Sequence, residues 1–285
     1  RSSRGLGDVY KRQVWTGVAA ISEGVLDLAP WKVGYALDAV TFAVSALIIL
    51  TLSLPVRAVV AQREEAGFSL RQGLRDFVDG VKYVMKVPAV RIPLVAVVWA
   101  VVGAAPIFVL GEPFSREVLG FGSTGFGVLA TSIGFGMAVG VLAARLLDRA
   151  RMDLPVGLGM ALVIAGIGVI GVAFTDQLIT AATGGFTAGF GTGAAYVIAF
   201  TSIHASVEDE LRGRTFGTLY ALARMGIVVS LAAAPLLATA LDGLLDGTMS
   251  NGVRLTILLS GVLVISAGIV AGLGWLRHVR RESAA

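Results

Sequence analysis

The sequence predicts an all-α protein that crosses a membrane several times. Hydrophobic residues make up 56% of its 285 residues and charged residues only 15%, whereas a soluble domain carries about 25% charged residues. Apolar runs of about 20 residues, the length that spans a hydrocarbon core, recur along the chain. Lys and Arg gather in alternate connections between these runs, which is the pattern that orients membrane helices.

The composition excludes several kinds of functional site. The chain has no Cys and only two His residues, His204 and His278, which lie far apart in the sequence. We therefore expect no thiolate or imidazole metal site, no disulfide and no cofactor. The net charge of +4 comes largely from the first thirteen residues, which hold four basic residues and one acidic residue. The remaining charges nearly balance, so a nucleic-acid partner is not expected.

The beginning of the chain shares no pattern with the rest. Residues 1–13, "RSSRGLGDVYKRQ", end in a stretch that looks like the translated end of a sequencing-library adaptor. We expect this segment to lie outside the fold, the alternative being a native basic arm. The apolar stretch 14–28 is shorter than a full span and is expected to be the end of a longer helix.

Seven complete spans are expected after that stretch. They cover residues 33–54, 92–110, 125–147, 154–174, 178–203, 216–241 and 255–276. The connections between the last six are short, so neighbouring helices should be antiparallel. The sequence thus predicts a segment 14–55 with one full span, a polar interval 56–91, a six-helix bundle over 92–277 and a tail 278–285.

The interval 56–91 sets the expected orientation. It holds seven basic residues, and short loops rich in Lys and Arg remain in the cytoplasm. Counted from this interval, the internal connections and the tail hold fifteen basic residues, whereas the loops 111–124, 175–177 and 242–254 hold two, Arg116 and Arg254. We therefore expect a plasma-membrane protein with a cytoplasmic C-terminus.

An amphipathic helix is expected within the same interval. Ser69 and Gln72 match a capping box, and Pro88 should end the helix. Apolar residues recur at helical spacing between them, at Leu70, Leu74, Phe77, Val81 and Val84. We expect this helix to lie on the membrane surface as a tether between two bundles, the alternative being a regulatory role.

Glycines four residues apart are expected to pack a helix closely against a neighbour. Gly185, Gly189 and Gly193 would share one face of the span 178–203. Tight packing and a glycine hinge are the two interpretations of this spacing.

Two charged residues fall inside expected spans, where an ionised side chain costs about 3 kcal/mol on insertion scales. Asp38 would load and release a coupling proton, or else pair with Lys32 or cap a neighbouring helix. Arg224 would hold an anionic substrate or a gating carboxylate, or else extend toward the inner headgroups.

Other residues of the spans are candidates for a substrate cavity or for a gate. Trp99, Thr187 and Tyr196 would line a cavity for a partly apolar ligand, the alternative being helix packing. The stretch 207–217, "VEDELRGRTFG", alternates acidic and basic residues, which form salt bridges in one conformation and release them in another.

Three stretches resemble one known family. "DELRGRTFG" resembles the acidic-x-Arg-Gly-Arg signature between the tenth and eleventh helices of the major facilitator superfamily. "ALDAVTFAVSALIIL" resembles the sixth helix of its drug and macrolide efflux branch, and "FSREVLGFGSTGFGVLATSIGFGMAVG" resembles its seventh-to-eighth helix region. In this frame the spans are a partial helix 5 and helices 6 to 12, and 92–277 is the C-terminal six-helix bundle.

The resemblance adds Asp148 and Arg149 to the candidates for a cytoplasmic gate. In "ARLLDRARMD", Asp148 and Arg149 match part of the pattern Gly-x-x-x-Asp-Arg-x-Gly, although Ala144 and Arg151 stand where glycines are expected. The candidates for the cytoplasmic gate are Asp148, Arg149, Glu210, Arg212 and Arg214.

The resemblance implies a secondary active transporter in which two bundles rock around a mid-membrane site. It implies proton-coupled efflux of a small amphipathic compound, with the bilayer, protons and a preceding N-terminal bundle as partners. No GxxxxGK[ST] loop is present, so transport driven by ATP is not expected. The alternatives are a non-transporting scaffold or receptor, and a membrane enzyme, for which no catalytic or metal-binding residues converge.

Overall fold

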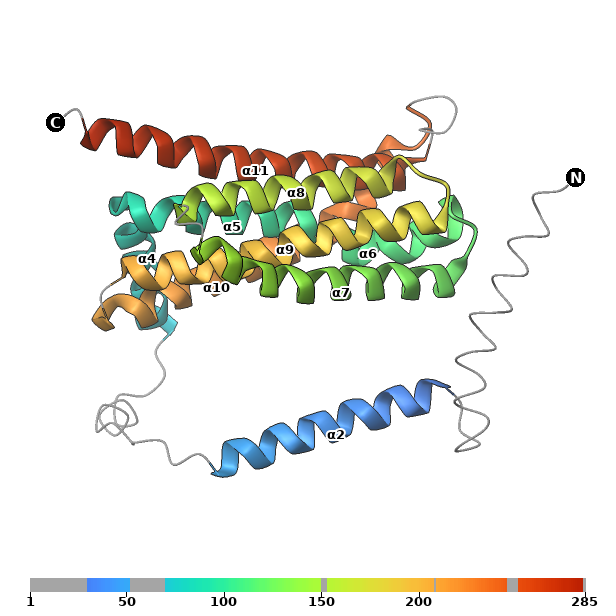
Figure 1. Ribbon diagram of the computed structural model, residues 1–285, viewed down its shortest axis with the longest axis horizontal. Helices are drawn as coiled ribbons and strands as arrows, with labels where there is room; N and C mark the ends of the chain where they lie inside the picture. Colours follow the sequence, from blue (N-terminus) through green and yellow to red (C-terminus); the bar gives the residue numbers. More distant parts are fainter. Residues whose placement is uncertain (1–29, 52–69, 150–152, 208, 245–250, 284–285) are drawn as a thin grey trace, which may run out of the picture. The chain divides into compact units, whose positions relative to one another are not determined.

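The computed structural model describes residues 30–51, 70–149, 153–207, 209–244 and 251–283 (Figure 1). Every regular element in these residues is a helix, as the sequence predicts. The chain divides into two compact units, residues 1–68 and 69–285. The expected adaptor segment and the expected partial span 14–28 lie outside the described residues.

The first unit contributes one described helix, α2, over Pro30–Thr51. Its 22 residues rise about 33 Å, which is enough to cross a hydrocarbon core. The helix forms because the segment is almost wholly apolar and has no Gly or Pro in its central turns. Asp38 is its one acidic residue.

The second unit contains six stretches long and apolar enough to cross a membrane, counted in the described residues. The first is built from α5 (Pro88–Ala104), α6 (Pro106–Pro113) and the π-helical turn η1 (Phe114–Val118). The others are α7 (Gly122–Arg149), α8 (Leu154–Ala173), α9 (Leu178–Ser206), α10 (Asp209–Leu241) and α11 (Gly252–Glu282). The expected six-helix bundle is therefore present.

The first crossing differs from its predicted end. The sequence predicts a loop over 111–124, whereas the helix continues to Val118. Pro113 lacks a backbone N–H, which favours a wider π turn over the α-helical ladder. Phe114 and Ser115 in this turn are fully buried, and their packing keeps the chain helical where Gly and Pro suggest a loop.

Two apolar clusters at opposite ends of the bundle fix the helix directions. Leu94 of α5, Ile203 of α9 and Leu219 of α10 share one cluster with Val84. Leu110, Ala181 and Ala234 share the other. The first crossing and α10 therefore run in the same direction, and α9 runs in the opposite direction, as short connections require. We call the end marked by Val84 the α4 end.

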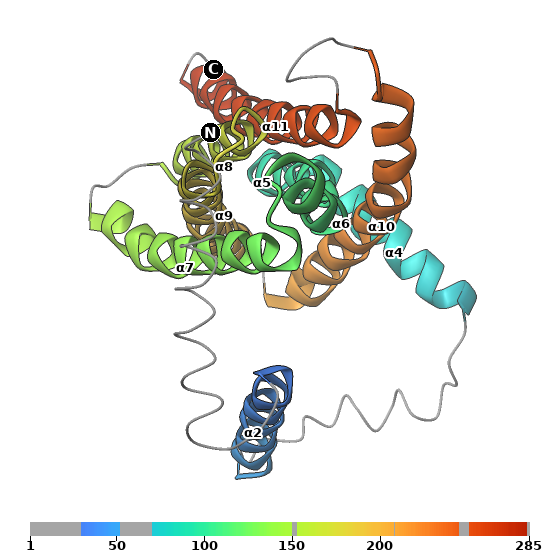
Figure 2. The ribbon, with the colours of Figure 1, turned by 90° about the vertical axis from the view of Figure 1, so that its right-hand side faces the viewer.

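Glycine contacts join α7, α9, α8 and α11 into one curved layer (Figure 2). Gly185, Gly189 and Gly193 all face α7, as their spacing predicts, and a Cβ at Gly189 would overlap the backbone oxygen of Ile133. Similarly, a Cβ at Gly159 of α8 would lie 2.7 Å from the backbone oxygen of Gly268 in α11. Backbones in such contact form a tightly packed layer.

Helix α10 is held mainly by side chains instead. Gly226 faces the side chain of Val102 on α5, and the Ser230 hydroxyl donates a hydrogen bond of 2.7 Å to the backbone oxygen of Val102. In Figure 2, α5 lies between α10 and the glycine-packed layer. The face of α10 directed away from α5 is left open.

The expected amphipathic helix is present as α4, over Leu70–Lys86. Its second half packs on the bundle, because Val84 is buried and a Cβ at Gly80 would overlap the hydroxyl of Thr218 on α10; the side chains of Leu70 and Leu74 lie outside the described residues. The sequence suggests the membrane surface as partner, since an amphipathic pattern does not distinguish lipid from protein. In the structure α4 contacts α10 and α5.

Candidate functional site

Helices α5, α9 and α10 each carry an aromatic or charged side chain at about the same depth in the bundle. Leu94, Ile203 and Leu219 lie together near the α4 end. Trp99, Tyr196 and Arg224 are five to seven residues farther from that end on α5, α9 and α10. At a rise of about 1.5 Å per residue, all three lie about 8 to 11 Å beyond the shared cluster. This level lies inside the membrane-crossing stretches, nearer to the α4 end than to the other end.

Aromatic side chains connect α9 to α10 between that level and the α4 end. The ring centroid of Phe200 on α9 lies 4.5 Å from that of Tyr196, 5.5 Å from that of Phe216 and 6.2 Å from that of Tyr220. His204 lies 4.4 Å from Phe216. Residues four apart share one helix face, so the rings of α9 meet the rings of α10. We call these five residues the aromatic cluster.

The outer rings at this level are open. Tyr196 is 55% exposed, Tyr220 is 48% exposed and Trp99 is 43% exposed. Phe200, by contrast, is partly buried against the apolar cluster at the α4 end, and it contacts both tyrosines. The two exposed tyrosine rings therefore rest on a packed base, whereas Trp99 lies on the side of α5 that faces α11, one turn from Gly103.

Arg224 extends the same face of α10. It lies four residues after Tyr220 and is exposed. Residues four apart lie on the same face of a helix, so Arg224 and Tyr220 share one face of α10. Among the described residues, no carboxylate forms an ion pair with it.

The depth of Arg224 in α10 favours a face that does not meet lipid, the alternative being a side chain that extends toward the inner headgroups. The residue is 15 positions from the beginning of α10 and 17 from its end. A charge at this depth costs about 3 kcal/mol or more in contact with hydrocarbon, and such residues face protein or a water-filled cavity. The open rings beside it share that environment.

The third predicted cavity residue, Thr187, is not brought to this face. It precedes Tyr196 by nine residues, which is two and a half turns, so it lies on the opposite side of α9. Its hydroxyl donates to the backbone oxygen of Thr183 at 2.9 Å. Thr192, one turn from Tyr196, is exposed on the shared side.

Sequence reasoning missed most of the aromatic cluster. The repeats of four residues in Tyr196, Phe200 and His204, and in Phe216 and Tyr220, were visible signals. The contact between α9 and α10 depends on tertiary packing, so these repeats do not predict it.

Asp38 lies on α2, in the first unit, eight residues after Pro30. The Thr41 hydroxyl donates a hydrogen bond of 2.8 Å to the backbone oxygen of Asp38, and this contact does not involve the Asp38 carboxylate. The side chain of Lys32, its alternative partner, lies outside the described residues. The role of Asp38 stays a prediction.

The gate candidates lie at the α4 end. Arg212 and Arg214 occupy the first two turns of α10, where Arg212 is half-buried and Arg214 is exposed. Asp148 and Arg149 belong to the last turn of α7. The side chains of Asp148, Arg149 and Glu210 lie outside the described part of the chain, so the gate ion pairs also stay a prediction.

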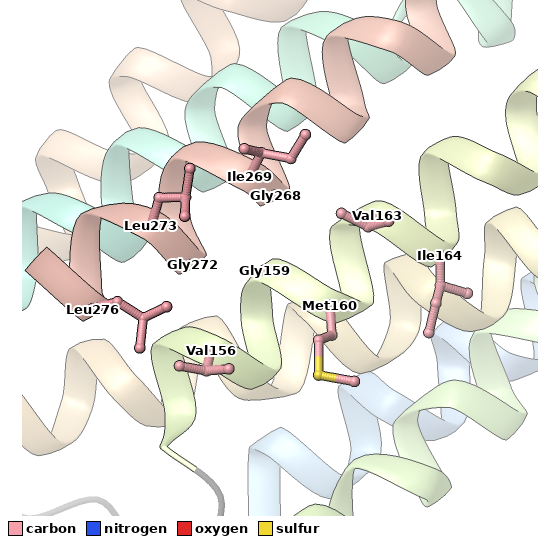
Figure 3. Close-up of a pocket in the computed structure, with 10 residues that line it drawn as sticks. All are labelled: Val156, Gly159, Met160, Val163, Ile164, Gly268, Ile269, Gly272, Leu273 and Leu276. Carbon is pink, nitrogen blue, oxygen red and sulfur yellow. The ribbon is translucent and has the colours of Figure 1, made fainter.

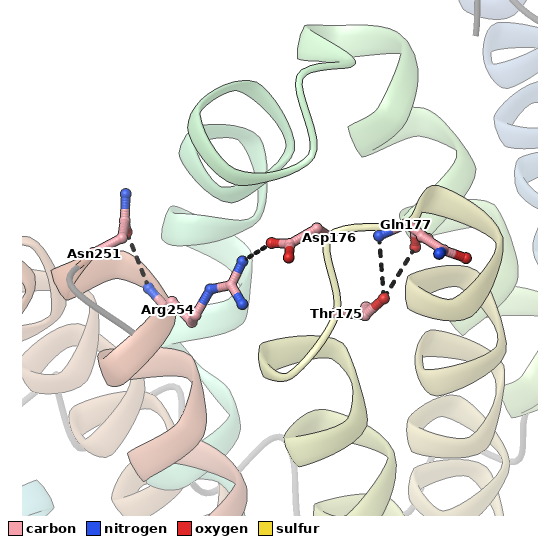
Figure 4. A network of polar contacts seen from close by, with 5 residues as sticks. All are labelled: Thr175, Asp176, Gln177, Asn251 and Arg254. Carbon is pink, nitrogen blue, oxygen red and sulfur yellow. Dashed lines mark hydrogen bonds and ion pairs between the residues drawn. The ribbon is translucent and has the colours of Figure 1, made fainter. Parts of the chain in front are cut away.

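A polar network joins the connections at the other end of the bundle (Figure 4). Arg254 of α11 is only 5% exposed and forms an ion pair with Asp176, in the connection between α8 and α9. Asn251 accepts a hydrogen bond of 3.2 Å from the N–H of Arg254 and donates one of 3.5 Å to Glu117. This network fixes three helix ends but contains no open binding face.

An apolar groove of about 410 Å³ lies between α8 and α11 (Figure 3). Its lining includes Met160, Ile164 and Leu273, with Gly159 and Gly268 at its base. No polar side chain lines it. The groove therefore has no group to orient a polar substrate, and the face of Arg224 remains the candidate site.

Comparisons with known proteins give the family. Neither the curated proteins nor the solved structures contain a match to this chain. The family model of the Major Facilitator Superfamily matches residues 16–217, which is well over half of the chain. The matched stretch includes α2, all of α5 to α9 and the "DELRGRTFG" motif at the start of α10. The chain therefore belongs to the Major Facilitator Superfamily, a family of membrane transporters rather than enzymes.

Proposed function

We propose that this chain is part of a secondary active transporter that exports a small amphipathic compound in exchange for protons. The observation that carries the proposal is the open face shared by α9 and α10, where the exposed rings of Tyr196 and Tyr220 accompany the exposed Arg224, one turn beyond Tyr220. Binding sites for small molecules combine apolar and aromatic walls with a few polar groups that orient the ligand. This face has both.

In the proposed mechanism a companion bundle, as the resemblance implies, closes over this face. Binding at the interface of two bundles and rocking of one against the other gives alternating access. The glycine contacts of α7, α9, α8 and α11 allow this layer to move as one body. Helix α4, which is fixed on α10 and α5, would transmit movement of the preceding chain to α10.

The charges at the two ends support the proposed orientation. Lys82, Lys86, Arg91, Arg145 and Arg277 lie at the α4 end, which we place in the cytoplasm. The two basic residues expected outside, Arg116 and Arg254, both pair with carboxylates. We place the protein in the plasma membrane with its C-terminus in the cytoplasm.

We assign proton coupling and gating to named residues, and we take the direction of transport from the resemblance. Asp38 is the proposed proton carrier, because a carboxyl group within a span takes up and releases protons as its access alternates. The gate at the cytoplasmic side would consist of Asp148 and Arg149 on α7 and of Glu210, Arg212 and Arg214 on α10. Export follows from the resemblance to the drug and macrolide efflux branch.

The test uses the full-length protein in lipid vesicles with a pH gradient and an internal pH-sensitive dye. A panel of amphipathic drugs and dyes is added, and we expect at least one compound to dissipate the gradient. Asp38→Asn should abolish this proton movement while leaving binding of the compound intact, and Asp79→Asn, at an exposed carboxylate of α4, should change neither. A panel that never moves protons would favour a non-transporting scaffold or receptor instead.

A further inference from the structure

We infer that the open face of α9 and α10 selects an anionic compound with a planar aromatic ring, held by Arg224 and by the open rings of Tyr196 and Tyr220. The inference deepens the proposed function and rests on its assignment of this face as the substrate site. It concerns the charge and shape of the ligand, which the family does not specify.

The first argument is charge. Arginine stays protonated in proteins, and Arg224 has no ion-pair partner among the described residues. A cation at this depth needs a counter-charge. Helices α5 and α9 contain no Asp or Glu, and α10 contains none after Glu210. The charge of these three helices at this level is therefore purely positive, which favours an anion and disfavours an organic cation.

The second argument decides between a ligand and a carboxylate of another helix. Where this bundle packs helices closely, it does so through small residues, as at Gly189 against Ile133 and Gly168 against Ala188. The face of Arg224 has bulky open rings instead. Such a face is poorly shaped for a tightly packed helix, and well shaped for a flat molecule.

The third argument is geometry. Phe200 contacts Tyr196 and Tyr220 and so holds their rings in place before a ligand arrives. Aromatic rings stack on such surfaces. The planar guanidinium of Arg224, one turn away on the same face, makes two parallel hydrogen bonds with a carboxylate or sulfonate. A ring bearing an acidic group within a few atoms matches both features.

The test measures binding of two probes that share a ring system, 2-naphthoate and the neutral 2-naphthamide, to the full-length protein in detergent by calorimetry. We expect naphthoate to bind wild type about tenfold more tightly or better, the scale of a hydrogen-bonded charge pair. Arg224→Gln should reduce naphthoate to the affinity of the amide, and Arg224→Lys should keep part of the preference. Arg277→Gln, at an exposed residue of α11 that belongs neither to this face nor to the proposed gate, is the matched control and should keep all of it.

Unchanged binding of the amide to Arg224→Gln would show that this variant is folded. Equal affinities of both probes for wild type, a preference that survives Arg224→Gln, or no measurable binding of either probe would each overturn the inference. Equal affinities would also be the result if a carboxylate of the companion bundle neutralised Arg224. Because the readout is binding and not proton movement, a protein that transports but shows no charge preference refutes this inference alone.

Discussion

Removing Asp176 from its ion pair with Arg254 should destabilise the protein more than removing Arg254 does. The side chain of Arg254 is 5% exposed, and that of Asp176 is 57% exposed. Removing the carboxylate leaves a buried cation whose Nε already has no hydrogen-bond partner among the described residues. Removing the arginine leaves a carboxylate that water can solvate. The two deletions should therefore differ in cost.

The size of the difference follows from this burial. Breaking a fully buried pair on one side costs about 3 to 5 kcal/mol, but water reaches Asp176, so we expect Asp176→Ala to cost about 2 kcal/mol. Arg254→Met keeps most of the side-chain volume and should cost less than about 1 kcal/mol. In the double variant the cost should fall to that of Arg254→Met, since no buried charge then lacks a partner.

The assay is thermal unfolding of the purified protein in detergent, followed by tryptophan fluorescence. Glu112→Ala is the matched control, because Glu112 and its partner Arg116 are 38% and 62% exposed at the same end of the bundle. Exposed pairs contribute little, so its melting temperature should stay near that of wild type. Equal losses for Asp176→Ala and Arg254→Met, or a loss for Glu112→Ala as large as for Asp176→Ala, would refute the reasoning.

Two further predictions concern glycine contacts. Gly189→Ala should lower the free energy of unfolding by about 1 to 3 kcal/mol, because its Cβ would overlap the backbone oxygen of Ile133. Gly127→Ala, which has open space around it, should instead stabilise α7 by about 0.5 kcal/mol or more. Equal melting temperatures of the two variants would contradict the contact. Gly80→Leu should push α4 off Thr218 and raise hydrogen exchange over residues 70–86, while exchange in α9 stays constant. The exposed neighbour Asp79→Ala is its control, and an unaltered exchange pattern in Gly80→Leu would show that α4 is not docked there.

The sequence predicts the spans well because bilayer thickness imposes a length on every apolar run. The predicted span 154–174 and the helix Leu154–Ala173 agree within a residue. Agreement fails at 111–124, where the chain stays helical through a π turn. Gly111 and Pro113 lower the local helix propensity, but burial of Phe114 outweighs it. Local propensity describes the isolated segment and carries no information on that burial.

The candidate site is predictable by residue type but not by grouping. Trp99 and Tyr196 were expected to line a cavity, and both are exposed, but Trp99 lies on the α11 side of α5 and Tyr196 lies on the side of α9 that meets α10. Thr187 was expected with them, but it lies on the other side of α9. Helical periodicity separates Thr187 from Tyr196 even without a structure. By contrast, the meeting of Phe200 with Phe216 and Tyr220 requires the positions of two helices.

Arg254 and Arg224 differ in how the described part of the bundle neutralises them. Arg254 stabilises the fold, and the chain supplies Asp176 as its counter-charge together with burial at a helix end. Arg224 lies deeper in its helix, is exposed, and has no carboxylate partner among the described residues. A protein that satisfies one arginine internally has the means to satisfy the other. An open cation among open rings, kept at a depth where it is costly, is therefore best explained by a partner that comes and goes.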